Sequence, residues 1–128
     1  MKANELRIGN IVEHDGLVLS VLGVSESDVE IQRPGGYASE WVDLDDCEPI
    51  PLTEEWLKSL GANQCTPAND HQNKYTYGRF VLLWRSKYQY WNVNDLESFG
   101  HISKVEFVHE WQNLVYVLNG EELEKTQR

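Results

Sequence analysis

Short apolar runs separated by turn residues fill the first fifty residues, and they constrain the fold more than any other feature. Asp15-Gly16 stands between two such runs, and glycine supplies the positive φ that a primed hairpin turn needs. Residues 29–32 alternate apolar and polar side chains, as a half-buried strand does. Four or five such strands with tight turns predict a small, bent antiparallel sheet of the SH3-like type over residues 1–50.

A short helix is predicted directly after this sheet, at residues 53–60. Thr53 is a suitable N-cap, two glutamates follow it at the positive end of the helix dipole, and Gly61 fits a left-handed C-terminal position. Trp56, Leu57 and Leu60 would then face a sheet. The preceding segment, Pro-Ile-Pro-Leu at 49–52, breaks the strand pattern and serves as a connector.

The second half of the chain combines strands with one longer helix. Residues 75–84 are expected to form a single strand with Gly78 as a bulge, and residues 88–93 the returning strand of a hairpin. Residues 62–74 are polar and are predicted to be a loop. From 105 to 119 the apolar period becomes helical.

The predicted fold class is therefore α+β. It consists of an SH3-like bent antiparallel sheet at the N-terminus, a short helix, a β-hairpin, and a C-terminal helix packed on the sheet. Residues 1–128 are expected to form a single compact unit, with 1–50 as the β subdomain and 51–128 as an α+β part. The predicted core is Leu6, Ile8, Ile11, Val18, Val21, Val29, Ile31, Trp56, Leu60, Leu82, Trp84, Val108, Trp111, Leu114 and Leu118.

The charge of the chain is negative and unevenly placed. It carries 21 acidic residues against 11 Lys and Arg, with 13 acids and 4 bases in residues 1–64 and 8 acids and 7 bases in residues 65–128. An acidic front half makes duplex DNA an unlikely ligand, because phosphate neutralisation supplies most of the affinity for DNA. It permits a basic protein as partner.

The cellular setting is predicted from the N-terminus, the apolar runs and the cysteines. Residues 1–5 lack the apolar segment of a signal peptide, and no apolar run approaches the roughly 18 residues that span a bilayer. Cys47 and Cys65 belong to no CxxC or zinc-finger spacing. We therefore expect a cytoplasmic protein with reduced thiols and no membrane contact.

An acidic run at the end of the first sheet is a candidate docking patch for a basic partner. It comprises Asp43, Asp45, Asp46 and Glu48. An EF-hand loop would require glycine at its sixth position, where this run has Glu48, so the calcium pattern fails. The other interpretation is a solvated turn at the end of a strand.

The hairpin at 75–91 is the second candidate binding surface. It holds seven of the fourteen aromatic residues, interleaved with basic ones. Exposed rings beside cations could stack unpaired bases, stack on sugars or hold an extended peptide. Strand alternation should, however, send about half of the rings into the core, which is the simplest interpretation. The candidate residues are Tyr75, Tyr77, Arg79, Arg85, Lys87, Tyr88, Tyr90 and Trp91.

Catalytic and metal motifs give little support to an enzyme. Glu106-x-x-His109 places a carboxylate and an imidazole on one face of the predicted helix, but a carboxylate-bridged metal site needs two such motifs. The sequence has no G-x-S-x-G elbow, Walker A loop or Rossmann glycine pattern. We therefore predict a protein that is not an enzyme and has no cofactor or metal, with an enzyme lacking any recognisable motif as the alternative.

Four segments together resemble a known family. They are ANELRIGN at 3–10, PIPLTEEWL at 49–57, VHEWQNL at 108–114 and LNGEEL at 118–123. In this order they resemble a family of small, uncharacterised proteins of Bacteroidetes-type bacteria, their phages and other mobile elements. The resemblance implies a bacterial cytoplasm or a prophage as the setting, and it brings no activity, cofactor or site residue.

The functional prediction from sequence is a non-catalytic protein-binding or accessory module of a bacterial or prophage system. Its partner would contact the acidic half or the aromatic hairpin, and an exposed strand edge could take an extended peptide. The alternative is binding of single-stranded nucleic acid through residues 75–91.

Overall fold

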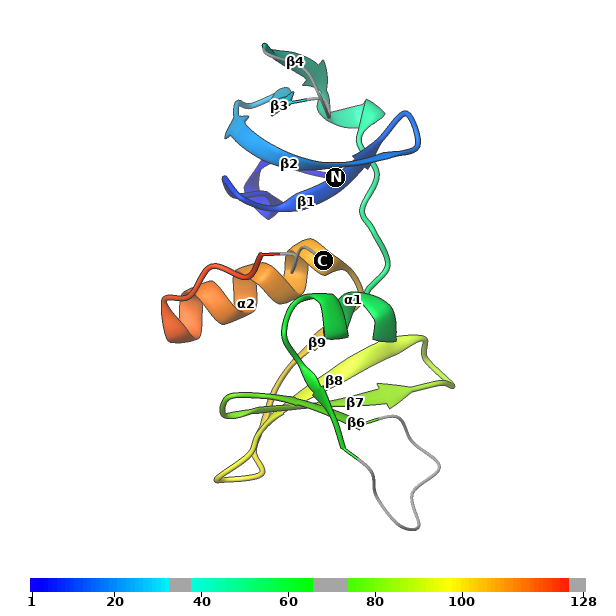
Figure 1. The fold of residues 1–128 in the computed structure, drawn as a ribbon, viewed down its shortest axis with the longest axis vertical. Helices are drawn as coiled ribbons and strands as arrows, with labels where there is room; N and C mark the ends of the chain where they lie inside the picture. The colour runs from blue at the N-terminus through cyan, green and yellow to red at the C-terminus, as the bar shows by residue number, and fades with distance from the viewer. Residues whose placement is uncertain (33–37, 66–73, 125–128) are drawn as a thin grey trace. The chain divides into compact units, whose positions relative to one another are not determined.

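The chain folds into two compact units, drawn in Figure 1 from a computed structural model that describes residues 1–32, 38–65 and 74–124. Unit 1 comprises Met1–Pro51 and Phe107–Glu122, and unit 2 comprises Leu52–Glu106 and Leu123–Arg128. The fold is α+β, with two antiparallel sheets, a short helix and a C-terminal helix, as the sequence predicts.

Unit 1 contains a four-stranded antiparallel sheet, called sheet 1, in the order β1-β2-β3-β4. Its strands are not closed into a barrel. The predicted hairpin is confirmed: Asp15 and Gly16 have φ of 52° and 75°, as a primed turn requires. The elements are η1 (Ala3–Glu5), β1 (Ile11–His14), β2 (Leu17–Val24), β3 (Asp28–Gln32), β4 (Ser39–Asp43), η2 (Leu44–Asp46) and the C-terminal helix α2 (Val108–Asn119).

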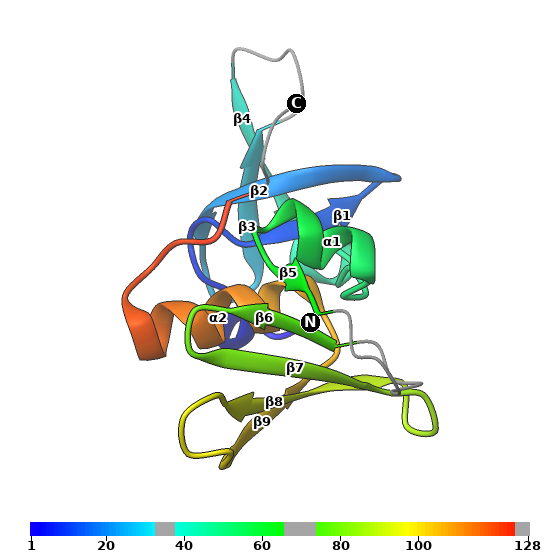
Figure 2. The same cartoon turned by 60° about the horizontal axis from the view of Figure 1, so that its bottom comes forward.

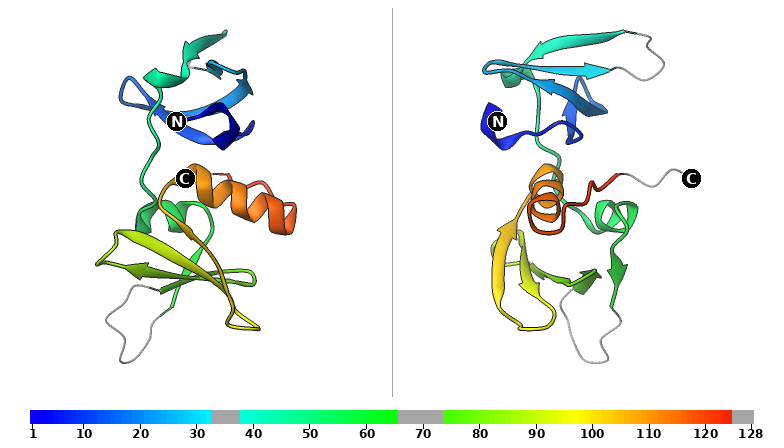
Figure 3. Two further views of the ribbon diagram at one scale, coloured as in Figure 1. Left: turned by 180° about the vertical axis from the view of Figure 1, so that it is seen from behind. Right: turned by 90° about the vertical axis from the view of Figure 1, so that its left-hand side faces the viewer.

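Alternate side chains of sheet 1 form the hydrophobic core of unit 1, which also includes Cys47. β4 is the last strand of the order, so only one of its edges has a described strand beside it, as Figure 3 shows. The buried members of the core are Leu6, Val12, Leu19, Val21, Val29, Ile31, Leu44 and Cys47.

Helix α2 is joined to the start of the first strand by hydrogen bonds that are buried or partly buried. The Gln112 side chain accepts from the Ile11 backbone N–H at 2.8 Å and donates to the Gly9 carbonyl at 3.1 Å. The Asn10 side chain donates to Asn113 Oδ1 at 2.8 Å. The sequence placed this helix with the hairpin, whereas its contacts group it with the N-terminal sheet.

Unit 2 contains a five-stranded antiparallel sheet, called sheet 2, in the order β5-β6-β7-β8-β9, which Figure 2 shows strand by strand. Helix α1 (Glu54–Ser59) precedes it, and Thr53 Oγ1 accepts from the Trp56 N–H at 3.2 Å, which confirms the predicted N-cap. The strands are β5 (Asn63–Gln64), β6 (Lys74–Tyr77), β7 (Phe80–Arg85), β8 (Tyr90–Asp95) and β9 (His101–Val105).

One face of sheet 2 packs beneath α1 and the segment before it. Tyr75 donates from its hydroxyl to Glu54 Oε1 at 3.0 Å, and the Trp91 indole N–H donates to the Leu52 carbonyl at 2.7 Å. Figure 3 shows α1 on this side of the sheet. The face that carries the rings of Tyr75 and Trp91 is therefore the inner face of sheet 2.

The predicted strand over 75–84 is wrong, because a turn divides it into β6 and β7. Gly78 has a φ of 55° and lies with Arg79 in that turn, so the glycine reverses the chain and forms no bulge. The predicted loop at 62–74 also begins with a strand, since Asn63 pairs with Thr76 in β5 and β6. Residues 66–73 lie outside the described residues.

Several predicted core positions are exposed. Ile8 has 61% and Val18 has 45% of its surface accessible, and Leu118 is also exposed near the end of α2. Ile8 lies in the turn before β1, where no strand alternation applies. Trp56 is only partly buried, and Leu57 is the residue of α1 that is fully covered.

Candidate binding surfaces

Two of the aromatic residues predicted for the hairpin surface, Tyr75 and Trp91, are core residues. Both are buried on the inner face of sheet 2, and their rings meet edge to face with centroids 5.7 Å apart. Burial and the hydrogen bond to Glu54 raise the pKa of the Tyr75 hydroxyl to about 12. Neither ring is accessible to a ligand, so both leave the candidate surface.

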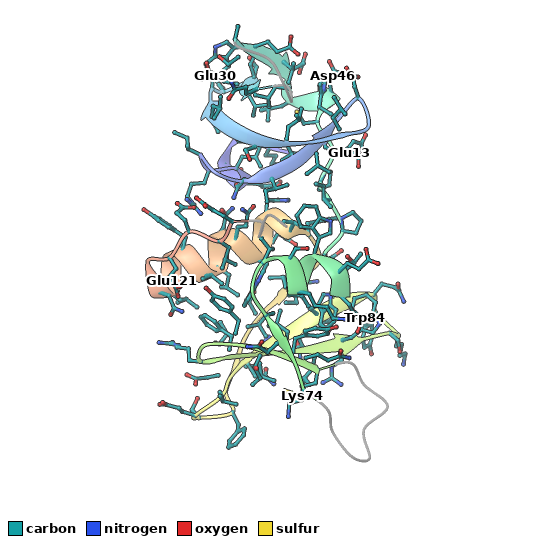
Figure 4. All side chains as sticks on the ribbon, viewed as in Figure 1. Glu13, Glu30, Asp46, Lys74, Trp84 and Glu121 are labelled. Atoms are coloured by element: carbon teal, nitrogen blue, oxygen red, sulfur yellow. The ribbon has the colours of Figure 1, made fainter. Side chains whose placement is uncertain are left out.

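Tyr77 and Trp84 also belong to the inner face. The strand register pairs Tyr77 with Phe80 and Trp84 with Trp91, and paired residues lie on the same face of a sheet. The Trp84 and Trp91 centroids are 5.1 Å apart. Figure 4 shows Trp84 on the side of the sheet that α1 covers.

Five of the predicted surface residues are solvent-accessible on the other side of the sheet or in its turns: Arg79, Arg85, Lys87, Tyr88 and Tyr90. Arg85 pairs with Tyr90, and both lie on the face of sheet 2 opposite the inner face, because they neighbour the inner-face pair Trp84 and Trp91. Tyr88, in the turn between β7 and β8, is 60% exposed, and its ring stacks on Tyr90 with centroids 5.7 Å apart. Lys87 Nζ lies 5.5 Å from the Tyr88 ring centre.

Sequence reasoning missed two lysines that the sheet adds to this surface. Lys74 begins β6 and Lys104 lies in β9, and Lys104 Nζ is 5.4 Å from the Tyr90 ring centre. Arg79, in contrast, lies in the β6–β7 turn near the Phe80 ring. The signal that could have found the lysines is strand register, which for Lys74 needs the correct turn at Gly78.

All four members of the predicted acidic patch are exposed in unit 1. Asp43 ends β4 and accepts from the Asp45 N–H at 3.2 Å, so it caps η2. Glu48 follows η2 and pairs with Glu13 through two backbone hydrogen bonds of 2.8 and 3.0 Å. Within the described ranges, Asp43, Asp45, Asp46 and Glu48 have no ion pair with a lysine or arginine. The patch therefore presents uncompensated negative charge.

Two more features adjoin this acidic patch. Asp28 lies directly opposite Asp43 across β3 and β4, and like charges in that position destabilise a sheet. Trp41 of β4 is 53% exposed and pairs with Glu30. A Cβ on Gly23 would come within 3.3 Å of the Trp41 ring, so the absence of a side chain at Gly23 leaves room for the ring on the sheet. Figure 4 shows Glu30 and Asp46 extending outward from unit 1.

Other titratable groups offer no comparable surface. Burial lowers the pKa of His109, against Glu110 and Glu5, which raise it, and the His109 Nε2 lies 3.8 Å from Glu5 Oε2. Burial raises the pKa of the Cys47 thiol, and the nearby carboxylate of Asp46 raises it further. A buried thiol with a raised pKa is a poor nucleophile.

The predicted helix over 105–119 begins later, at Val108, so Glu106 precedes α2 and only His109 belongs to it. The helical face that would have joined this pair does not exist. Within residues 1–32, 38–65 and 74–124, no group of three or more His, Cys, Asp and Glu side chains could hold a metal ion.

Comparison with known proteins adds no relative. No family model matches the chain, and neither the curated proteins nor the solved structures include a significant match. In the part of the chain that the structure describes, no helix is both long enough and apolar enough to cross a bilayer.

Proposed function

We propose that this chain is a non-catalytic protein-binding module of a bacterial or prophage system, and that sheet 1 takes an extended, basic segment of its partner. The observation that carries the proposal is the composition of β4. This strand ends the sheet, displays the half-exposed ring of Trp41, and leads into the acidic run Asp43, Asp45 and Asp46.

An open strand edge supplies backbone hydrogen bonds to a peptide of any sequence, so side chains must supply the specificity. Trp41 offers a ring face to a lysine or arginine side chain. The carboxylates of Asp43, Asp45 and Asp46 lie just beyond the ring in the sequence and have no lysine or arginine partner within the described chain. These features together favour a partner segment that alternates basic and apolar residues.

The opposition of Asp28 and Asp43 supports the same partner. Two carboxylates facing each other across neighbouring strands cost stability in the free protein. A basic side chain bound beside them would relieve that repulsion. Part of the binding free energy would then come from the loss of the repulsion between Asp28 and Asp43. Association should also be faster at low salt, because complementary charge steers the encounter.

The test is a titration of ¹⁵N-labelled protein with a ten-residue peptide that alternates lysine and valine. We expect the shift changes to concentrate on the β4 amides and the Trp41 indole N–H. A peptide with glutamate in place of lysine should leave the spectrum unchanged.

A matched pair of variants distinguishes the effect of the acidic patch on affinity from the effect of net charge. The triple substitution D43N/D45N/D46N keeps an acceptor at the cap of η2 and removes three charges. The control E55Q/E97Q/E124Q removes the same number from exposed positions of unit 2. We expect affinity to fall roughly tenfold in the first variant and to change little in the second. An equal loss in both, or peptide shifts away from β4, would refute the proposal.

A further inference from the structure

The face of sheet 2 opposite α1, its outer face, carries a row of side chains that crosses four strands. The register joins Lys74 of β6 to Leu83 of β7, Leu83 to Asn92 of β8, and Asn92 to Lys104 of β9. With strands about 4.8 Å apart, the two lysines stand about 14 Å from each other. Figure 4 shows Lys74 extending from the side of the sheet away from α1.

The neighbouring row adds an arginine and a tyrosine. Arg85 pairs with Tyr90, two positions along β7 from Leu83, so this row lies on the same face. Tyr90 is half-buried and Arg85 is exposed. The outer face therefore carries three cations and an aromatic ring within two adjacent rows.

The described strands of sheet 2 place no acid on this face. Their single acidic residue is Asp95, and its register partner Phe80 is buried on the inner face. The acid closest in sequence to these rows is Glu106, which follows β9. This composition is unusual in a chain whose formal net charge is -10. The charge divides between the units, because unit 1 holds 14 acids and 3 Lys and Arg, and unit 2 holds 7 acids and 8 Lys and Arg.

Aromatic rings and ammonium groups are combined at one end of the face. Tyr90 and Tyr88 stack with an angle of 21° between their planes. Lys104 Nζ lies 5.4 Å from the Tyr90 ring, and Lys87 Nζ lies 5.5 Å from the Tyr88 ring. A base stacked on either ring would bring its phosphate within reach of a cation. Base stacking tolerates any sequence, and it requires bases that are not paired.

We propose that the outer face of sheet 2 and its adjoining β7–β8 turn bind single-stranded nucleic acid, with Tyr88 and Tyr90 as the stacking platform and Lys74, Arg85, Lys87 and Lys104 as the phosphate contacts. The site shares no residue with the acidic patch of sheet 1, so it does not depend on the protein-binding proposal. A duplex fits less well, because its stacked bases are unavailable to the tyrosines.

The test uses fluorescence anisotropy of the full chain with labelled 20-mers of oligo(U), oligo(dT) and a mixed-sequence DNA duplex. We expect both single strands to bind more tightly than the duplex. With four phosphate contacts, the logarithm of the affinity should fall with the logarithm of salt concentration with a slope of about -2.8. The comparison of oligo(U) with oligo(dT) assigns the site to RNA, to DNA or to both.

Matched variants separate this site from general attraction to polyanions. The substitution K74Q/K104Q should weaken binding and reduce the salt slope to about -1.4, since two contacts remain. The control K2Q/K58Q removes two exposed lysines outside sheet 2 and should leave both quantities unchanged. Y90L and Y88A should each weaken oligo(U) binding roughly 5- to 100-fold without changing the salt slope.

Three results would overturn the proposal. The first is the absence of measurable single-strand binding at 50 mM salt. The second is duplex binding as tight as single-strand binding. The third is equal competition by poly-glutamate together with unchanged affinity in the tyrosine variants, which would assign the face to acidic polypeptides. Circular dichroism of Y90L and Y88A shows whether the sheet is retained, and Y88A changes a turn residue that is 60% exposed.

Discussion

Replacement of Gln112 tests a buried polar side chain that joins α2 to the start of β1. Its side chain is fully buried in α2, with Oε1 accepting from the Ile11 N–H at 2.8 Å and Nε2 donating to the Gly9 carbonyl at 3.1 Å. The orientation of the amide follows from these partners, because a backbone N–H needs an acceptor and a carbonyl needs a donor. One side chain thus satisfies two backbone groups at the start of β1.

Gln112→Met keeps the length of the side chain and removes its hydrogen bonds to the two backbone groups and to the Asn10 side chain. Each buried backbone group left without a partner costs about 1–3 kcal/mol. The Gly9 carbonyl is only partly buried, so the total loss should be about 2–4 kcal/mol. The measurement is urea unfolding followed by circular dichroism, together with amide hydrogen exchange at Ile11.

Gln112→Glu adds a dependence on pH that the methionine variant lacks. A protonated carboxylic acid can accept from Ile11 and donate to Gly9, as the amide does, but a carboxylate cannot donate. Burial and the facing carbonyl raise the folded-state pKa of the new Glu above its unfolded value of about 4.3. The native state then binds the proton more tightly, so stability relative to the parent is retained below pH 4 and is lost as pH rises toward the folded-state pKa. The slope in that range should be about 1.4 kcal/mol per pH unit.

The control substitutions are Gln64→Met and Gln64→Glu at an exposed position of β5. The free energy of unfolding of each control should lie within about 0.5 kcal/mol of that of the parent. Two results would refute the reasoning: a Gln112→Met variant as stable as the parent, or a Gln112→Glu variant whose deficit does not change between pH 4 and pH 7. Either would mean that the buried amide does not satisfy the β1 backbone.

Three further substitutions have predictable effects. Phe99 is 80% exposed with a φ of 60°, so Phe99→Gly should raise the free energy of unfolding by about 0.5–1 kcal/mol, measured by urea titration; a loss of stability would show that the exposed ring is needed. Asp43→Asn keeps the cap of η2 and removes the repulsion from Asp28, so it should stabilise unit 1 by a few tenths of a kcal/mol, and 1 M salt should abolish the difference. The pKa of Tyr75, about 12, lies above the value of about 10 for an unfolded tyrosine. The contribution of the neutral Tyr75 hydroxyl to the free energy of unfolding is therefore intact below pH 10 and is lost between pH 10 and pH 12. Tyr75→Phe should lack that loss when urea midpoints are compared from pH 9.5 to 11.5, and an unchanged slope would contradict the assignment.

The N-terminal hairpin, the N-cap of α1 and the C-terminal end of α2 could be predicted because short-range chemistry decides them. Asp15-Gly16 requires only that two consecutive residues accept positive φ, and both do. Thr53 caps α1 three residues from its partner, and Gly120 ends α2 with a φ of 71°. Each of these signals acts within one turn of the chain.

The predicted bulge at Gly78 is a turn between β6 and β7, and local sequence does not distinguish the two. A glycine within an apolar run is compatible with a bulge or with a turn, and neighbouring strands decide which one forms. The turn changed the number of strands, and with it the side chains that share each face. The candidate surface therefore changed as well: Tyr75 and Trp91 belong to the core, and Lys74 and Lys104 belong to the outer face.

The sequence by itself determined the α+β class, the local turns and caps, and the concentration of acidic residues in the first half. Only the tertiary structure decided that the Asn10 and Gln112 side chains join α2 to the first strand across about a hundred residues of sequence. It also decided which cations and rings share one face of sheet 2. The physical reason is that composition and periodicity act over a few residues, whereas strand register and burial depend on segments brought together from distant parts of the chain.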